Sequence, residues 1–289
     1  MSGIPAPGWL RDRRFDVCVY HANCPDGFGA AWAVRAAKGD AVRYVAGHSH
    51  RPVSPADYRG LAVLLVDYCW ERPTLEAVLA EARSITVIDH HLTARDAVGG
   101  LDLPGLETFF DMERSGASLA WVAFHAGEAP PLIRHVEDYD LFRFALPGTD
   151  EINLALTSRP FDFAEWDRLD TAALKAEGAA ILRWVSAQVD CLAASAGRAA
   201  LAGLDVPCAN APGCFVDRLG HRLAEGEPFA VVWAETADAV HFSLRSRPDG
   251  LAVNRVAEAF GGRGHRHAAV FALPKDSPEI ARILRRRQP

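Results

Sequence analysis

Three short apolar segments in the first third of the chain constrain the fold most. They are DVCVY (16–20), LAVLLV (61–66) and SITVI (84–88), and segments with helix-like composition lie between them. Such runs are rich in β-branched residues, which favours strands. Because strands that alternate with helices usually form parallel βαβ units, the sequence predicts an α/β fold built on a parallel sheet.

Other segments extend this pattern. Strands are predicted at 41–45 and 107–110, and helices at 29–37, 74–83, 115–124 and 132–139. A long helical stretch over 166–196, broken near Gly178, is predicted as a connector. Beyond it, strands at 229–234 and 239–245 and helices at 253–260 and 278–286 predict a smaller mixed-sheet α/β domain. We therefore expect a first domain at 1–165, a helical connector at 166–196 and a second domain at 197–289.

Composition limits the partners of the chain. Its 289 residues are 49% apolar and 24% charged, as in ordinary globular proteins. The net charge of −6 argues against a protein that coats duplex DNA. No apolar run approaches the roughly 18 residues that span a bilayer, and the first residues do not resemble a secretory signal. The six cysteines form no CxxC pair, which favours reduced thiols. We expect a cytoplasmic protein without a membrane or duplex-DNA partner.

Residues that bind metals or protons follow each of the three apolar segments. They are His21 and Asp26 after the first, Asp67 after the second, and Asp89, His90 and His91 after the third. In open parallel sheets, ligands bind beyond the carboxyl ends of the strands, so these side chains are expected to share one site. Carboxylates that gather there need a divalent cation to offset their repulsion. The competing interpretation of a single aspartate is that it caps the next helix.

The donor types indicate which ion fits. Imidazoles and carboxylates without an obvious thiolate suit Mn²⁺ best, with Mg²⁺ or Fe²⁺ as alternatives, rather than a closed structural zinc site. A metal of this kind lowers the pKa of bound water and stabilises the leaving oxygen in an attack on phosphorus. The donor types thus predict metal-assisted hydrolysis, and the motifs described next point to a phosphoester or a phosphoanhydride as the substrate.

Five motifs in order resemble those of the DHH phosphoesterases, which include RecJ-like nucleases, oligoribonucleases, cyclic-dinucleotide phosphodiesterases and family II pyrophosphatases. The tripeptide Asp89-His90-His91 resembles the DHH signature. HANCPDG (21–27), LVD (65–67) and DYDLFRF (138–144) resemble the first, second and fourth motifs, and GGRGHRHAA (261–269) resembles the GGGGHxxAAG motif of the companion DHHA1 domain. The resemblance implies a DHH domain that carries the chemistry and a DHHA1 domain that selects the substrate.

The resemblance also implies roles for single residues. One metal ion would be held by His21, Asp26 and Asp67, and a second by Asp67, His90 and Asp138, with Asp67 bridging. Asp89 would orient a neighbouring ligand, and His91 would contact the substrate phosphate. Substrate-binding roles fall on Arg245, Gly261, Gly262, Gly264 and His265.

Some features of the sequence have competing interpretations, and one departs from the family pattern. The glycine-rich segment 261–264 can form an anion-binding nest or can end the preceding helix. Arg114 and Ser115 open a helix that can bind a phosphate, or Ser115 can simply cap it. Phe28 stands where the family usually has a further carboxylate, so we expect a weaker second metal site, with Asn23 or water as a partial substitute. Cys24 is interpreted as a small half-buried turn residue rather than a metal ligand.

The expected substrates are short oligonucleotides or small nucleotide phosphoesters, because a DHHA1 domain closes over a ligand end and the chain lacks a broad basic surface. A polyphosphate or pyrophosphate hydrolase uses the same metals and is the alternative within enzymes. A nucleotide-binding module without turnover is the alternative of another class. The sequence leaves the oligomeric state open, a homodimer included.

Overall fold

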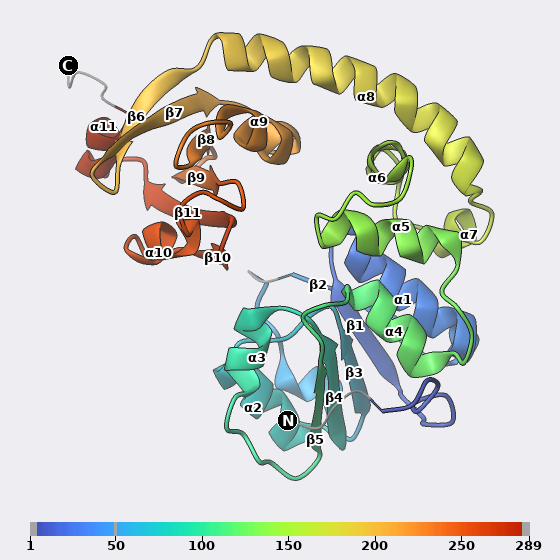
Figure 1. Cartoon of the computed structure of the whole chain (residues 1–289). Helices are drawn as coiled ribbons and strands as arrows, with labels where there is room; N and C mark the ends of the chain where they lie inside the picture. Colours follow the sequence, from blue (N-terminus) through green and yellow to red (C-terminus); the bar gives the residue numbers. More distant parts are fainter. Residues whose placement is uncertain (1–4, 49–50, 285–289) are drawn as a thin grey trace. The chain divides into compact units, whose positions relative to one another are not determined.

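The computed structural model describes residues 5–48 and 51–284. The chain divides into two compact units, Met1–Leu182 and Arg183–Pro289, and the division falls inside helix α8 (Thr171–Ala194). Figure 1 shows the elements of each unit along the chain. The two-domain α/β architecture predicted from the sequence is confirmed, whereas the predicted boundaries at 165 and 196 remain predictions.

The first unit is built on a five-stranded sheet whose pairs are all parallel. Its strands are β1 (Val17–His21), β2 (Arg43–Gly47), β3 (Ala62–Val66), β4 (Ser84–Asp89) and β5 (Leu106–Phe110). Their order is β2-β1-β3-β4-β5, so the chain reverses the direction of strand addition between β1 and β3. Ligands of such sheets bind at this reversal, outside the carboxyl ends of the strands.

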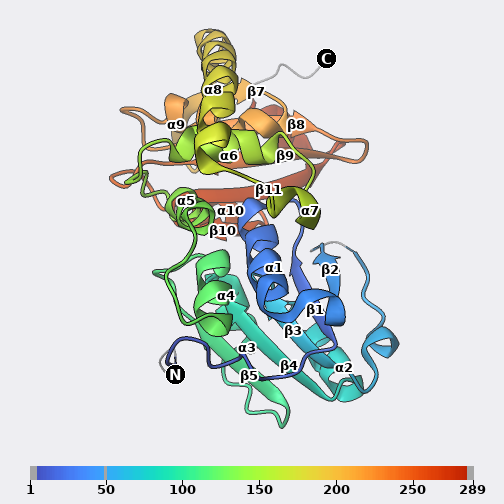
Figure 2. The ribbon, with the colours of Figure 1, turned by 90° about the vertical axis from the view of Figure 1, so that its right-hand side faces the viewer.

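Helices cover both faces of this sheet, which is why β3 is buried along its whole length. Helices α1 (Pro25–Lys38) and α4 (Gly116–Phe124) pack on one face, where Figure 2 shows them side by side. Helices α2 (Arg72–Glu81) and α3 (Leu92–Val98) pack on the other face, together with the short 3-10 helix η2 (Pro55–Tyr58). The sequence predicted α1, α2 and α4 but not α3.

A second helical layer packs against α1 and α4. It contains α5 (Pro131–Asp140), α6 (Thr149–Thr157) and α7 (Phe163–Trp166), and its core includes Phe28 and Trp166. The predicted break near Gly178 is wrong, because α8 runs continuously through this position. A Cβ atom at Gly178 would lie 1.8 Å from the carbonyl oxygen of Glu151, so this glycine permits close packing of α8 on α6.

The second unit contains a six-stranded mixed sheet in the order β10-β11-β9-β8-β7-β6. Strands β8 (Ala230–Glu235) and β9 (Ala239–Arg245) were predicted from the sequence, as were helices α10 (Val253–Glu258) and α11 (Pro278–Ile283). The sequence missed strands β6 (Gly197–Leu201), β7 (Leu204–Asn210), β10 (Arg263–His265) and β11 (Ala268–Pro274) and helix α9 (Val216–Leu223). None of the helices in the described part of the chain is long and apolar enough to cross a membrane.

Candidate metal centre

One imidazole nitrogen lies among three carboxylates at the carboxyl edge of the parallel sheet. The Nε2 atom of His90, directly after β4, lies 3.2 Å from Asp67 Oδ1, 3.6 Å from Asp26 Oδ2 and 3.5 Å from Asp140 Oδ2. This nitrogen is buried and has no hydrogen-bond partner among the described residues. An imidazole with three carboxylates converging on it is the donor set of a cation site.

Asp67 lies at the centre of this arrangement. It follows β3 in a left-handed backbone conformation (φ 52°), which is strained for a residue with a side chain. The side chain is 1% exposed, and neither carboxylate oxygen has a hydrogen-bond partner in the described part of the chain. Burial and the charge of Asp26 raise the pKa of Asp67 well above its usual value. A buried carboxylate without donors requires a counter-charge to ionise.

Asp26 is held by the first turn of α4. Its Oδ2 accepts a hydrogen bond from the Gly116 N–H at 2.6 Å, and its Oδ1 accepts one from the Ala117 N–H at 2.9 Å. Gly116 also permits close approach to Asp67, since a Cβ atom there would lie 2.3 Å from the Asp67 Cβ. The helix N-terminus therefore binds a carboxylate of this chain, and the N–H groups of Gly116 and Ala117 are not available to a phosphate. Ser115 caps the helix by accepting from the Ser118 N–H at 3.3 Å.

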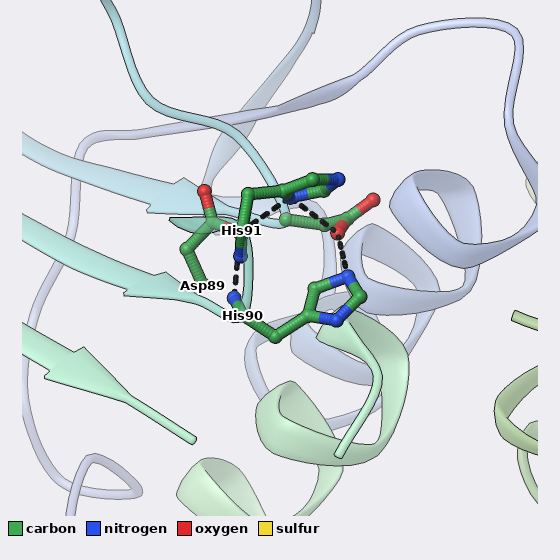
Figure 3. A group of neighbouring side chains, drawn as sticks. Asp89, His90 and His91 are labelled. Carbon is green, nitrogen blue, oxygen red and sulfur yellow. Dashed lines mark hydrogen bonds and ion pairs between the residues drawn. The ribbon is translucent and has the colours of Figure 1, made fainter. Parts of the chain in front are cut away.

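Asp89 organises the two histidines that follow it. Its Oδ1 accepts from the backbone N–H groups of His90 (2.6 Å) and His91 (3.0 Å) and lies 2.7 Å from Nδ1 of His91 (Figure 3). Burial lowers the pKa of His91, but the bond to Asp89 and the charges of Asp67 and Asp89 outweigh it and raise the pKa to about 9. Asp89 therefore positions His91, with Nδ1 occupied, beside the carboxylate cluster.

The structure places Asp140, and not the predicted ligand Asp138, at the cluster. The carboxylate of Asp138 accepts hydrogen bonds from the N–H groups of Ala145 (2.8 Å) and Leu146 (3.0 Å) and from the Thr149 hydroxyl (2.6 Å). These bonds hold the pKa of Asp138 below its usual value although burial raises it. Loss of solvent and the charge of Asp26 raise the pKa of Asp140 to about 7. Residues two positions apart in a helix are separated by about 200° around its axis. The carboxylates of Asp138 and Asp140 therefore face opposite sides of α5.

A second donor group shares Asp67. Ligand atoms of His21, Cys24 and Asp67 lie within 4.8 Å of one another, as do those of Asp26, His90 and Asp140. The donor atoms of Asp26 therefore lie near those of His90 and Asp140. The family resemblance instead implied that Asp26 and His21 hold the same ion. Cys24 is the additional donor that sequence reasoning set aside. Burial and the charge of His91 lower the pKa of His21, which favours the neutral imidazole that a metal binds.

Phe28, which stands where a further carboxylate was expected, belongs to a hydrophobic core. Phe28 is 2% exposed and stacks on Phe163 with ring centroids 4.6 Å apart, inside the core of the second helical layer. Position 28 therefore faces the core and not the ligands. Asn23, the suggested substitute, is exposed in a left-handed turn (φ 58°).

The predicted substrate-binding residues of the second unit have structural partners. The N–H groups of Gly261 and Gly262 donate to the carbonyls of Glu258 and Ala257, so they end α10 rather than form an anion nest. Gly264 packs against β11, where a Cβ atom would lie 2.4 Å from Ala269 Cα.

The predicted arginines are also engaged, to different degrees. Arg245 donates to Asp217 from Nε (2.8 Å) and Nη2 (2.5 Å). Arg114, in the first unit, is about two-fifths exposed and lies 3.7 Å from Asp111. The side chain of His265 lies outside the described part of the structure.

Solved structures resemble the chain over almost its full length. RecJ from Thermus thermophilus in complex with Mn²⁺ matches with a TM-score of 0.63 and 16% identity, over 97% of this chain and 54% of RecJ. A DHH domain from a member of a family of ribosomal proteins matches with a TM-score of 0.59 and 12% identity, over 92% and 84% of the two chains. The chain therefore shares the fold of RecJ and of this DHH domain. It spans about half the length of RecJ, which has also been solved with Mg²⁺.

Two further proteins are similar to this chain. A pGpG-specific phosphodiesterase, PggH from Vibrio cholerae, matches with a TM-score of 0.51 and 10% identity, over 93% of this chain and 96% of PggH. An uncharacterized protein of Acanthamoeba polyphaga mimivirus is 26% identical over an alignment 301 positions long, gaps included, which covers 94% of this chain and 71% of the viral protein. No protein-family profile matches the chain.

Proposed function

We propose that this protein is a divalent-metal-dependent phosphoesterase that hydrolyses phosphodiester bonds of short oligonucleotides or small nucleotide phosphoesters. The observation that carries the proposal is the unpartnered Nε2 of His90 facing Asp26, Asp67 and Asp140. The orphaned oxygens of Asp67 fit a cation, since a buried carboxylate is stable when it is paired or coordinates a metal. The fold likeness to RecJ and to a pGpG phosphodiesterase supports this reaction class.

The proposed ligands are His21, Asp26, Asp67, His90 and Asp140, which would hold one or two ions, with Mn²⁺ as the first choice. A bound ion of this kind supplies a Lewis acid that lowers the pKa of water and stabilises developing charge on phosphate oxygens. The α4 N–H groups fix the orientation of the Asp26 carboxylate. Asp89 occupies Nδ1 of His91, so a hydrogen bond from His91 to a substrate phosphate would use Nε2.

Exposed aromatic residues that follow Asp140 in the sequence favour a nucleotide substrate over polyphosphate. Phe142 (52% exposed) and Phe144 (40% exposed) follow Asp140 closely and contact each other edge to face, with centroids 4.8 Å apart. Both have left-handed backbones, with φ angles of 54° and 49°. Strained backbone and exposed aromatic rings are often found at ligand sites. We infer that these rings stack on a nucleobase, which polyphosphate lacks.

The proposal keeps substrate-binding roles for Arg114 in the first unit and for Arg245 in the second, but not for Gly261 and Gly262, whose N–H groups end α10. Arg245 is fixed by Asp217, so a phosphate would bind beside this ion pair or replace the carboxylate. Guanidinium groups suit this role because they bind phosphate in a planar, bidentate manner.

The test is hydrolysis of a dinucleotide and of polyphosphate by the purified full chain with and without Mn²⁺. We expect Mn²⁺-dependent release of mononucleotides, and we expect Asp67→Asn to reduce it to the rate without metal. Asp102→Asn, which changes an exposed loop carboxylate, is the matched control and should keep full activity. Release of phosphate from polyphosphate alone would favour the phosphoanhydride hydrolase. Nucleotide binding without hydrolysis of either substrate would favour the non-catalytic module.

A further inference from the structure

We propose that Cys24 binds a divalent metal ion through its thiolate, together with His21 and Asp67, and that this makes one position of the centre selective for a thiophilic ion. The inference rests on the metal centre of the proposed function and adds the class of ion that the centre takes. Donor atoms of these three residues lie within 4.8 Å of one another.

Cys24 lies between the end of β1 and the start of α1, three residues after His21. The strand β1 ends at His21, and the chain then turns through Asn23 (φ 58°) before α1 begins. Cys24 is the N-cap residue of α1, a position that usually carries serine, threonine, aspartate or asparagine because their oxygen accepts a helix N–H. Sulfur is a weak acceptor, so capping does not explain a cysteine here.

Independent evidence for a ligand comes from the partners of Cys24. Both oxygens of Asp67 and Nδ1 of His21 are buried without a hydrogen-bond partner among the described residues. The Asp67 side chain is 1% exposed, and its Oδ2 lies 4.0 Å from His21 Nδ1. Atoms without a hydrogen-bond partner, from two residues of metal-binding type, therefore lie near the sulfur. Water cannot satisfy them from the bulk because these atoms are inaccessible.

The two donor groups differ in chemical softness. Asp26, His90 and Asp140 offer only nitrogen and oxygen, which suit Mn²⁺ and Mg²⁺. Cys24, His21 and Asp67 offer sulfur, nitrogen and oxygen, which suit Zn²⁺, Fe²⁺ or Co²⁺. Because Asp67 belongs to the second group and lies 3.2 Å from His90, it can serve both positions. The centre would then hold two different metal ions, and the thiophilic ion would lie with Cys24, His21 and Asp67. Binding of that ion releases the thiol proton to solvent.

Cobalt spectroscopy tests this inference without reference to activity. We expect Co²⁺ added to the metal-free full chain to give a near-ultraviolet sulfur-to-cobalt charge-transfer band that saturates at one ion per chain. The band should be absent in Cys24→Ser and Cys24→Asp. It should persist in Cys69→Ser, a matched control that removes a half-buried thiol two residues after Asp67. Zn²⁺ affinity, measured by competition with a chelating dye, should fall in Cys24→Ser by about 100-fold or more, since loss of an indirect supporting partner already costs 10- to 100-fold.

A measurement on the wild-type protein tests the inference without depending on how the variants fold. Zn²⁺ should protect Cys24 from alkylation by iodoacetamide, as read by mass spectrometry, while the exposed Cys191 reacts at the same rate with and without the ion. Co²⁺ that fails to bind, or binds without the band, overturns the inference, as does a band that survives in both Cys24 variants. Mn²⁺-dependent hydrolysis without the band would leave the proposed function intact. The band without hydrolysis would support the thiolate ligand and refute the proposed function.

Discussion

The pair Asp138 and Asp140 provides the sharpest test of the site. Replacing either aspartate by asparagine is the same isosteric change, but we expect it to affect a different property at each position. The Asp138 carboxylate is 4% exposed and accepts three hydrogen bonds that tie the end of α5 to the start of α6. Asp140 instead lies 3.5 Å from His90 with a side chain that is 26% exposed. We therefore predict that Asp138→Asn damages stability and that Asp140→Asn damages metal binding.

The magnitudes follow from these contacts. In Asp138→Asn an amide NH₂ replaces one acceptor oxygen and faces N–H or O–H donors, which costs about 3 kcal/mol of unfolding free energy for a hydrogen bond to a charged group. At about 2–4 °C per kcal/mol, the midpoint of unfolding should fall by about 6–12 °C. Asp140→Asn removes a carboxylate whose pKa is raised to about 7, so the metal-free protein should keep its midpoint. Mn²⁺ at about 100 times its Kd should stabilise the wild type by about 2.7 kcal/mol.

Scanning calorimetry with and without Mn²⁺ measures both effects. The transition of the first unit is the one that Mn²⁺ shifts in the wild type. Asp138→Asn should start from a lower midpoint and keep the Mn²⁺ shift, whereas Asp140→Asn should keep the midpoint and lose most of the shift. If Asp138→Asn loses the Mn²⁺ shift while Asp140→Asn retains it, Asp138 is the ligand and the reasoning here is refuted.

Three further outcomes are expected. Replacing both Phe142 and Phe144 by alanine should raise KM for a dinucleotide about tenfold or more, since stacking contributes about 1–3 kcal/mol per base; an unchanged KM in steady-state assays would exclude stacking on these rings. Because Asp67 and Asp140 have raised pKa values, they hold protons at low pH, and Mn²⁺ affinity measured by calorimetric titration should fall about tenfold per pH unit below pH 7 for each proton displaced. An affinity that is constant from about pH 8 to about pH 5.5 would contradict this linkage. Gly178→Ala should lower the unfolding free energy in urea by about 2–3 kcal/mol because its Cβ meets the Glu151 carbonyl, while Gly127→Ala, whose Cβ meets open space, should not; equal effects would reject the packing argument.

Patterns local in sequence sufficed for much of the fold and part of the site. The apolar runs of β1, β3 and β4 predict the parallel sheet because a strand buried on both faces must be apolar along its length. The helices that follow them were predicted from the alternation of strand-like and helix-like segments, although α3 was missed. Strands of the second unit such as β6, with its sequence GRAAL, escaped detection because many of their residues face solvent and carry little apolar signal.

The candidate ligands also divide into those that the sequence predicted and those that it did not. That His21, Asp67 and His90 share one edge of the sheet follows from their places after parallel strands, and the structure brings their donor atoms together. The choice of Asp140 over Asp138 depends on the direction in which the end of α5 faces. The sequence motif contains both aspartates and does not encode that direction.

The sequence by itself therefore determined the α/β class and the edge of the sheet that carries the site, because these depend on hydrophobic periodicity and on strand ends. Its motifs carried the DHH/DHHA1 resemblance. Only the tertiary structure decided that the α4 N-terminus binds Asp26, that Phe28 belongs to the core and that Cys24 lies beside His21 and Asp67. These facts depend on how segments distant in sequence pack, and a carboxylate or thiol acquires its role from the donors, charges and solvent that packing places around it.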